Sequence, residues 1–463
     1  MIRTILRPSL GQSDRAQFFT WIIGFLGLIG SAVVIGTLIG QGRWLLLGFG
    51  VVMLLALQWP IEVALGAYVF LLPFGAITSL GGSGTSANFA LGAMAGIALI
   101  GTGLVRKRLS SPPREALWWS LFLLWSILTT AWALQPALSV HMIPRAIALA
   151  SLYLAAVCWE ITDKEFTVLS WLIIAGGFAA SCYMIYQYSH GITFVTTLGQ
   201  PGRASLVLGD SEANPNYLGA DLLLPLSLAV AAVVSARRFR STLLAIGITG
   251  IISYGIFLTM SRGSVLALAV IVAIFLLRLG FHRRLLVLLA LYGLIAAVMP
   301  GGLFSRIQAA ASDAGSGRLD IWKVGLVVLK RYGIVGAGLG NFRIAYTDYA
   351  GYASSFRGFA RGSHNVYLEA GVELGILGVV LLTGAFISHL RTARQRRPVQ
   401  GVISIQLVGL ECACWAMLLA GCFEGLCWTK SFWLTWTLPL MALGLKQRLL
   451  KAKPDESDIH QST

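Results

Sequence analysis

The chain has 463 residues, of which 57% are hydrophobic and only 12% are charged. Soluble domains carry roughly 25% charged residues, so this chain has too little polar surface for a soluble multi-domain protein. Its formal net charge is +16, but the basic residues occur in short clusters at the ends of apolar stretches. That placement argues against nucleic-acid binding and indicates the charge asymmetry of a membrane protein.

Apolar stretches long enough to cross a bilayer recur along the whole chain. The first covers about residues 18–40 and follows a segment that contains Arg3, Arg7 and Arg15. This pattern is also typical of a signal peptide. We interpret it as a signal anchor, because the apolar run is long, no small-residue cleavage site ends it, and more spans follow.

The later stretches predict an all-α polytopic membrane protein with about 12–14 transmembrane helices. Polar residues between 58 and 62 interrupt the second and third stretches, so a re-entrant element is an alternative to two spans there. The expected spans after the first are at about 44–58, 60–79, 87–105, 115–134, 144–160, 165–188, 215–236, 241–260, 263–280, 285–299, 365–390, 401–424 and 431–447.

Lysine and arginine residues concentrate in alternate connections between these spans, and in polytopic proteins such connections face the cytoplasm. Both termini fall on the same side, so we expect both to be cytoplasmic. The basic connections are 106–108, 237–240, 283–284 and 391–397, together with the C-terminal tail.

The opposite side carries two long loops, at about 189–215 and 300–364, and long loops often carry function. We divide the chain into an N-terminal transmembrane bundle at 1–200, a core at 201–390 that includes the larger loop, and C-terminal transmembrane helices with a cytoplasmic tail at 391–463. The larger loop is expected to carry short amphipathic helices.

Arginines gather on this outer side, where the positive-inside rule does not place them. Arg262 lies in a hairpin with almost no loop between two spans, so it sits at or just inside the membrane surface. A charge at that depth is a functional hypothesis by default, and an arginine that reaches for lipid headgroups is the structural alternative. The others are Arg203 in the first long loop and Arg306, Arg318, Arg343, Arg357 and Arg361 in the second.

The larger loop has internal order. Residues 317–331 have the pattern of an amphipathic helix, which we expect to lie on the membrane. The glycine-rich stretch 333–340 has part of the spacing of a nucleotide-binding fingerprint, but it follows a helix rather than a strand. A turn with a close backbone approach is therefore the better interpretation. Aromatic residues between 346 and 359 then alternate with Arg357 and Arg361, which suits either sugar stacking with phosphate pairing or anchoring at the membrane interface.

The loop ends at His364, directly before the next span. The positive end of a helix dipole disfavours imidazolium, and a neutral imidazole is what a general base requires near pH 7. A lone histidine is more often structural, but the arginines on the same side favour catalysis here. We expect arginines to hold a diphosphate while His364 takes a proton from a sugar hydroxyl and the diphosphate leaves.

No cofactor is expected for this reaction. The chain has no Walker-type phosphate loop, and its six histidines do not cluster. Cys412 and Cys414 point to different faces of a helix, which is a poor geometry for a metal. Apolar packing accounts for the six cysteines, although Cys422 and Cys427 lie near enough to the outer surface to pair.

Four short motifs stand in order around the larger loop. They are Asn214-Pro215-Asn216 at the start of a span; Ser261-Arg262-Gly263; Gly317-Arg318 with Trp322 and then Gly336-x-Gly338-x-Gly340-Asn341-Phe342; and His364-Asn365-x-Tyr367-Leu368-Glu369 followed by Gly375-Ile376-Leu377-Gly378. In order and spacing, these motifs resemble the bacterial O-antigen ligase and O-antigen polymerase superfamily over about residues 200–380. One departure is Tyr332-Gly333, where members often have a proline before the glycine stretch.

The resemblance implies a metal-independent, inverting glycosyltransferase of the bacterial inner membrane, which uses an undecaprenyl-diphosphate-linked glycan at the periplasmic face. Carried over onto the motif positions, Arg262 and Arg318 bind the diphosphate and His364 activates the acceptor hydroxyl, so these three are the expected catalytic residues. Five further residues are expected to bind substrate: Arg203, Asn216, Trp322, Arg361 and Asn365.

The motifs leave the acceptor open. The favoured expectation is a ligase that moves the finished glycan onto lipid A–core. The alternative is a polymerase that moves it onto another lipid-linked repeat unit of O-antigen or exopolysaccharide. A polysaccharide transporter or flippase is a third class, but it should carry ionisable residues near mid-membrane in discontinuous helices, and Asp221 and Glu411 are among the few candidates. The lipid bilayer is the remaining expected partner.

Overall fold

The computed structural model describes residues 51, 53–78, 87–194, 202–280, 283–298, 317–356, 358–394 and 402–451. The expected first span, the start of the second, and the side chains of Arg306 and Arg357 lie outside these residues. The described chain is almost entirely helical. Its sheet is a small antiparallel hairpin in which Val207 pairs with Glu212 and Leu208 pairs with Ser211.

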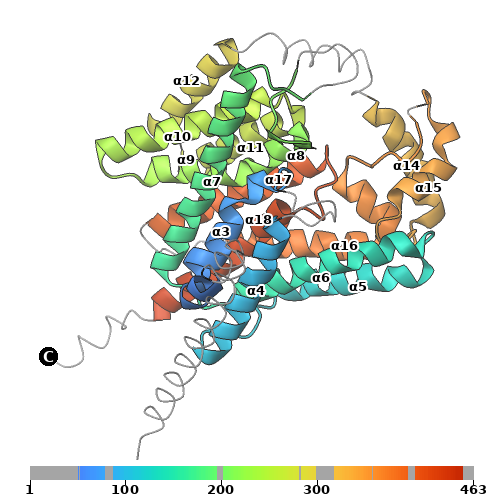
Figure 1. Ribbon diagram of the computed structural model, residues 1–463, viewed down its shortest axis with the longest axis horizontal. Coiled ribbons are helices and arrows are strands. Elements are labelled where there is room, and N and C mark those ends of the chain that lie inside the picture. Colours follow the sequence, from blue (N-terminus) through green and yellow to red (C-terminus); the bar gives the residue numbers. More distant parts are fainter. Residues whose placement is uncertain are drawn as a thin grey trace, which may run out of the picture.

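The helices follow one another with mostly short connections (Figure 1). The first are η1 (Pro60–Leu65), α3 (Gly66–Phe70), η2 (Leu72–Phe74), α4 (Ala87–Val105), α5 (Ala116–Leu128), η3 (Thr129–Trp132), α6 (Pro136–Cys158) and α7 (Asp163–Ser189). Next come β1 (Val207–Leu208), β2 (Ser211–Glu212), α8 (Pro215–Asp221), α9 (Leu223–Ser235), α10 (Phe239–Leu258), α11 (Arg262–Leu279) and α12 (Arg283–Val298). The last are α14 (Arg318–Tyr332), α15 (Phe342–Asp348), η4 (Ala350–Tyr352), α16 (Val366–Arg394), α17 (Val402–Gly421) and α18 (Lys430–Lys451).

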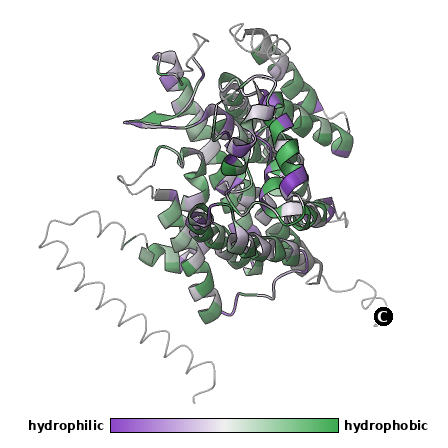
Figure 2. Cartoon of the chain, turned by 90° about the vertical axis from the view of Figure 1, so that its right-hand side faces the viewer, coloured by the Kyte–Doolittle hydropathy of each residue, from purple (hydrophilic) through white to green (hydrophobic). Residues whose placement is uncertain are grey.

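Seven of the described helices are long and apolar enough to cross a membrane. Figure 2 shows hydrophobic residues along most helices and hydrophilic residues in several of the connecting loops. Apolar side chains such as Ile97, Leu104 and Leu277 are exposed on the outside of the protein, where hydrocarbon rather than water is the favourable surrounding. The prediction of an all-α polytopic membrane protein is confirmed.

One span begins earlier than its pattern predicts. We expected it at 144–160, but α6 starts at Pro136 and continues through Pro144. A proline suits the first position of a helix, where its missing N–H is not needed. Packing against α4, α5 and α18 keeps the chain helical through the second proline. As a result, Arg145 lies well inside a membrane helix rather than at its first turn.

Arginines of two basic connections, 283–284 and 391–397, contact neighbouring helices of the bundle. Arg284 at the start of α12 donates to the carbonyl oxygen of Val234 at the end of α9, at 2.8 Å. Near the ends of α11 and α16, Glu411 accepts from Nε of Arg278 at 3.0 Å and lies 3.6 Å from Nε of Arg394. The carboxylate of Glu411 is therefore neutralised within the bundle, which leaves little support for a transport site there.

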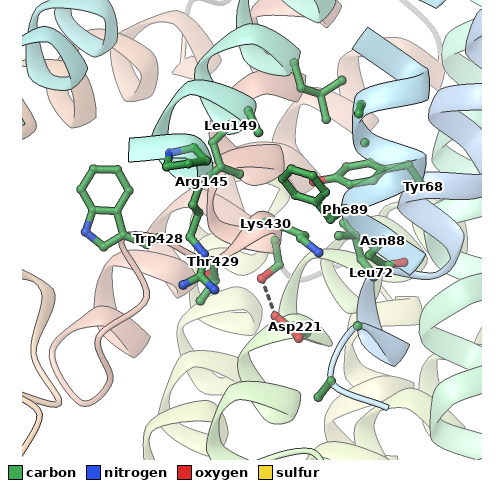
Figure 3. A pocket seen from close by; sticks show the side chains of 18 of the residues that line it. Tyr68, Leu72, Asn88, Phe89, Arg145, Leu149, Asp221, Trp428, Thr429 and Lys430 are labelled. Carbon is green, nitrogen blue, oxygen red and sulfur yellow. Dashed lines mark hydrogen bonds between the residues drawn. The ribbon is translucent and has the colours of Figure 1, made fainter. Parts of the chain in front are cut away.

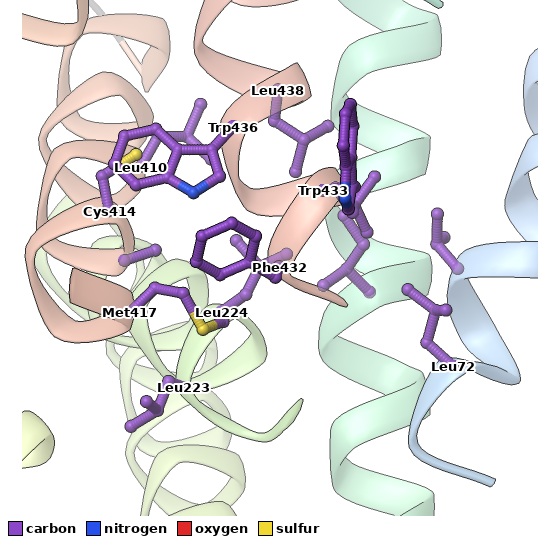
Figure 4. Close-up of a cluster of buried hydrophobic side chains, with 14 of the residues drawn as sticks. Leu72, Leu223, Leu224, Leu410, Cys414, Met417, Phe432, Trp433, Trp436 and Leu438 are labelled. Atoms are coloured by element: carbon purple, nitrogen blue, oxygen red, sulfur yellow. The ribbon is translucent and has the colours of Figure 1, made fainter. Parts of the chain in front are cut away.

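Aromatic packing holds the last helix of the bundle in place (Figure 4). The ring of Trp433 lies 4.6 Å from that of Trp119 on α5, and the ring of Trp436 stacks at 4.8 Å on that of Phe386 on α16. The side chains labelled in this cluster include Leu223 and Leu224 of α9 and Leu410, Cys414 and Met417 of α17. The turn between α17 and α18 is thus attached to a well-packed core.

The segment α14–α15 rests on protein. Buried residues on one face of α14, among them Ile321, Val324 and Val328, form a small core with α15 and α16. Gly325 of α14 and Leu368 of α16 are so close that a Cβ atom on the glycine would lie 2.6 Å from the leucine side chain. α16 thus covers one apolar face of this helix, whereas Leu319 and Leu326 of the same helix are exposed. The expected position of the helix on the membrane stays a prediction.

The glycine-rich stretch crosses a kink in α16. Gly336 has a φ of 85°, and a Cβ atom there would lie 2.2 Å from the carbonyl oxygen of Glu373. The kink itself is at Gly375, whose φ is 67°. Three backbone hydrogen bonds join the segments: from N–H of Ala337 to Val372 at 2.8 Å, from N–H of Gly338 to Glu373 at 2.9 Å, and from N–H of Ile376 to Gly333 at 2.7 Å. The predicted close backbone approach is confirmed.

We expect Gly336→Ala to destabilise the protein by about 1–3 kcal/mol or more, because the new side chain meets both a left-handed backbone and a facing carbonyl. The measurement is thermal unfolding of the purified protein in detergent. Gly351→Ala is the matched control, since its position has open space and no positive φ. Equal unfolding temperatures for the two variants would contradict the close packing of the glycine-rich stretch on the kink in α16.

Candidate functional site

A single buried carboxylate joins two of the expected catalytic residues. Glu424 lies in the turn between α17 and α18 and is buried. Its Oε1 accepts a hydrogen bond from Nη2 of Arg318 at the start of α14, and its Oε2 lies 3.0 Å from Nδ1 of His364. Residues that are far apart in the sequence therefore meet at this turn.

The contact with Glu424 orients the imidazole of His364. A carboxylate oxygen can only accept a hydrogen bond, so Nδ1 carries the hydrogen, and Nε2 of the neutral ring keeps its lone pair. The side chain is 37% exposed and lines a cavity of about 380 Å³. A histidine held on one side by a carboxylate and open to a cavity has the arrangement of a general base.

The loop that carries His364 is held in a strained conformation. The φ of His364 is 47°, and a non-glycine residue in this region costs about 1–3 kcal/mol. Trp322 of α14 donates from Nε1 to the carbonyl oxygen of Ser363 at 3.0 Å. Asn365 caps α16, since its Oδ1 accepts from the backbone N–H of Leu368 at 2.9 Å. Trp322 and Asn365 therefore position the base rather than face the cavity.

The third expected catalytic residue lies beside the same turn. Arg262 is half-buried and begins α11, after Ser261, whose side chain accepts from the backbone N–H of Ser264. The next residue, Gly263, is packed so closely on Phe423 that a Cβ atom there would lie 3.1 Å from the Cβ of the phenylalanine. Since Phe423 directly precedes Glu424, the turn brings Arg262 into the neighbourhood of Arg318 and His364.

Two of the expected substrate-binding residues contact each other. Arg203 is buried, and its Nη2 donates to Oδ1 of Asn216 at 2.5 Å. Its Nε donates to the carbonyl oxygen of Thr259 at 2.8 Å. These bonds brace the start of α8 against the end of α10, just before Arg262. Arg361, by contrast, is exposed, with its guanidinium beside Gly358.

The cavity at His364 has a mixed lining in which the carboxylates are already engaged. Glu369 accepts from Oγ of Ser363 at 2.7 Å. Glu373 accepts from the backbone N–H groups of Gly340 and Phe342 at 2.9 and 3.0 Å. The lining residues are Met142, Arg145, Tyr217, Gly340, Phe342, Arg343, Gly362, Ser363, His364, Glu369, Glu373, Gly425, Trp428 and Thr429. Its guanidinium groups thus come from Arg145 and Arg343, whereas Arg262, Arg318 and Arg361 are not among the lining residues.

Sequence reasoning missed Glu424 and Arg145. Glu424 is the single acidic residue between Glu411 and Asp455 and stands at the end of an apolar stretch, a placement that could have singled it out. Arg145 was not recognised because the expected span at 144–160 placed it at a helix end, where an arginine is unremarkable. Among the described residues, no group of three or more His, Cys, Asp or Glu side chains is placed to hold a metal ion.

Comparison with known proteins agrees with the motif order. Residues 247–383 match a family model described as O-antigen ligase. The chain is 26% identical over 291 residues to the exopolysaccharide production protein ExoQ of Rhizobium meliloti (strain 1021), and the match covers 59% of this chain and 64% of that protein. The chain thus spans less than two thirds of the length of that relative. These findings confirm the resemblance stated from the motifs.

The Arg318–Glu424 ion pair is testable through stability. We expect Glu424→Ala to lower the free energy of unfolding by roughly 1–3 kcal/mol, because it leaves a largely buried guanidinium without its counter-charge. The double variant with Arg318→Ala should lose less than the sum of the two single variants. Unfolding in detergent measures this difference. The control is Glu424→Ala combined with Lys323→Ala, for which the two losses of unfolding free energy should add. If the losses of Glu424→Ala and Arg318→Ala also add strictly, the ion pair is ruled out.

Proposed function

On the premise that this chain is a protein of the O-antigen ligase and polymerase superfamily, we propose that it is a metal-independent, inverting glycosyltransferase of the bacterial inner membrane. It transfers a glycan from undecaprenyl diphosphate to an acceptor hydroxyl at the periplasmic face. The observation that supports this most directly is the carboxylate of Glu424, which holds His364 and Arg318 together beside a cavity.

The proposed reaction uses Nε2 of His364 as the base. It removes the proton of the acceptor hydroxyl, and the oxygen attacks the anomeric carbon of the donor sugar from the face opposite the diphosphate. The bond between that carbon and the diphosphate oxygen breaks, and undecaprenyl diphosphate leaves with the bonding electrons. One displacement inverts the anomeric centre. Glu424 stabilises the imidazolium that forms, because its carboxylate already contacts Nδ1.

Arginines neutralise the leaving group in this proposal. A guanidinium has five N–H donors, so Arg318 can keep its bond to Glu424 and still donate to a phosphate oxygen. Arg262 approaches from the start of α11, and bidentate pairing with phosphate is the strongest geometry available to either side chain. The exposed Arg361 is assigned to the glycan outside the cavity.

The remaining assigned residues act through the scaffold. Trp322 and Asn365 set the backbone around His364. Arg203 and Asn216 hold α8 against α10, which positions the start of α11. Their roles in binding are therefore indirect, and substitutions there should lower activity through misplacement of the three catalytic residues.

We assign lipid A–core as the acceptor, which makes the reaction O-antigen ligation. The second candidate is a polymerase that joins lipid-linked repeat units. It is favoured by the similarity to ExoQ, whose name describes exopolysaccharide production. Both reactions use the same donor chemistry and differ in the molecule that presents the hydroxyl.

In a strain that lacks the protein, complementation with His364→Ala should lower transfer by about 10²–10⁴-fold, because the general base is lost. Arg318→Ala and Arg262→Ala should also abolish complementation, through lost charge stabilisation. Lipopolysaccharide and secreted polysaccharide are analysed on gels. His190→Ala is the matched control, since His190 is exposed and directly follows α7, outside the cavity at His364. Full activity of both His364→Ala and Arg318→Ala would refute the mechanism.

The same gels identify the acceptor. Loss of all O-antigen from core, with long chains retained on the lipid carrier, indicates a ligase. A single repeat unit on core indicates an O-antigen polymerase. Normal lipopolysaccharide with lost exopolysaccharide indicates polymerisation of a secreted polymer.

Transfer by the purified protein should be unchanged after exhaustive treatment with EDTA, because cationic side chains take the place of a metal at the leaving diphosphate. The rate of glycan transfer in detergent is the measurement, with a metal-dependent glycosyltransferase as the control for chelation. Loss of activity that added Mg²⁺ or Mn²⁺ restores would contradict the proposal.

A further inference from the structure

A second, larger cavity adjoins the one at His364 (Figure 3). It measures about 620 Å³ and lies between α3, α4, α6, α8 and the start of α18. The two cavities share four lining residues: Arg145, Tyr217, Trp428 and Thr429. A molecule that fills the larger cavity therefore contacts residues that also line the cavity at His364.

The larger cavity carries an excess of positive charge. Arg145 from α6 and Lys430 from the start of α18 both line it, and the carboxylate in its lining belongs to Asp221 of α8. Oδ1 of this carboxylate accepts from Oγ of Ser431 (Figure 3). Asp221 attracts Lys430, while Arg145 repels it. Arg145 forms no hydrogen bond or ion pair with the residues that the structure describes.

Such an arrangement is costly without a ligand. Arg145 lies nine residues after Pro136, the first residue of α6. At about 1.5 Å per residue, this places Arg145 well inside the membrane helix, away from its first turn. Cations at such positions are rare in membrane proteins, and they generally mark a substrate path. Arg145 is the cation that lacks a counter-charge among the described residues, so an anion from outside the protein can supply it.

The rest of the cavity is apolar. Leu72, Phe89, Leu149 and Leu152 line its walls on the η2, α4 and α6 sides. Phe89 is 40% exposed, and it shares α4 with the exposed Ile97. The apolar wall is thus continuous with a surface that faces hydrocarbon. An amphiphile whose anionic head lies at Arg145 and Lys430 can place its chain along this wall.

We propose that this cavity binds the phosphate-bearing end of the acceptor glycolipid, with its lipid chain along α4 and α6. This inference rests on the proposed function, in which Arg262 and Arg318 hold the donor diphosphate. Those arginines line neither cavity, whereas Arg145 lies in the wall common to both. Donor and acceptor phosphates therefore bind on separate groups of cations, with His364 within reach of the acceptor.

Arg145→Gln and Lys430→Gln test the site, because each removes a charge and preserves much of the side-chain volume. In transfer by the purified protein, we expect the KM for acceptor to rise about tenfold or more, as expected for the loss of one charge-assisted hydrogen bond. The KM for donor should not change. A rise in the KM for donor alone would overturn the assignment.

Binding measured without turnover separates this inference from the proposed function. The probes are undecaprenyl diphosphate, lipid A and inorganic diphosphate, each added to the purified protein in detergent. Weaker binding of undecaprenyl diphosphate in both variants supports an acceptor on a polyprenyl carrier, and weaker binding of lipid A supports a phosphorylated glycolipid. Unchanged binding of both lipids, or equally tight binding of inorganic diphosphate, overturns the proposal.

Two further variants serve as controls. Lys430→Arg keeps the charge and should retain acceptor binding, so a loss there would indicate misfolding or contradict the role of charge. Arg331→Gln removes an exposed cation from the end of α14, outside both cavities, and should behave as the unaltered protein. His364→Ala should bind both lipids normally, and its full activity would refute the proposed function while leaving the binding site intact.

Discussion

A buried carboxylate in a membrane protein must be neutralised, and Glu424 meets this requirement through Arg318 and His364. The rest of the site follows from that constraint. The start of α14, the loop before α16 and the turn between α17 and α18 must converge on one point. Convergence leaves Nε2 of His364 directed away from the carboxylate, and it leaves most donors of Arg318 available to a ligand.

Backbone contacts make this convergence rigid. The crossing of Gly336 over the kink at Gly375 ties the α14–α15 segment to α16, and the aromatic cluster around Trp433 ties α18 to α5 and α16. The strained φ of His364 can persist only because these neighbours restrict the loop. The side chain of His364, although it lies on a loop, is thus held as precisely as the helices around it.

Charges within the bundle have different roles. Near the ends of α11 and α16, Glu411 is neutralised by Arg278 and Arg394, so these charges stabilise the bundle. In the larger cavity, by contrast, the described lining holds Arg145 and Lys430 with one carboxylate, that of Asp221. An excess of cations beside apolar walls suits substrates that combine phosphate with a lipid chain, which is the chemistry that both proposals use.

Hydropathy and the pattern of charge are local properties, and from them the sequence by itself determined the all-α membrane architecture and the motifs that carry Arg262, Arg318 and His364. It could not show that Glu424 contacts Arg318 and His364, which lie 106 and 60 residues away. Nor could it show that α16 covers one face of α14, or that Arg145 lines a cavity together with His364. These features were decided by the tertiary structure alone, because they depend on which distant segments pack together, and no local periodicity records that.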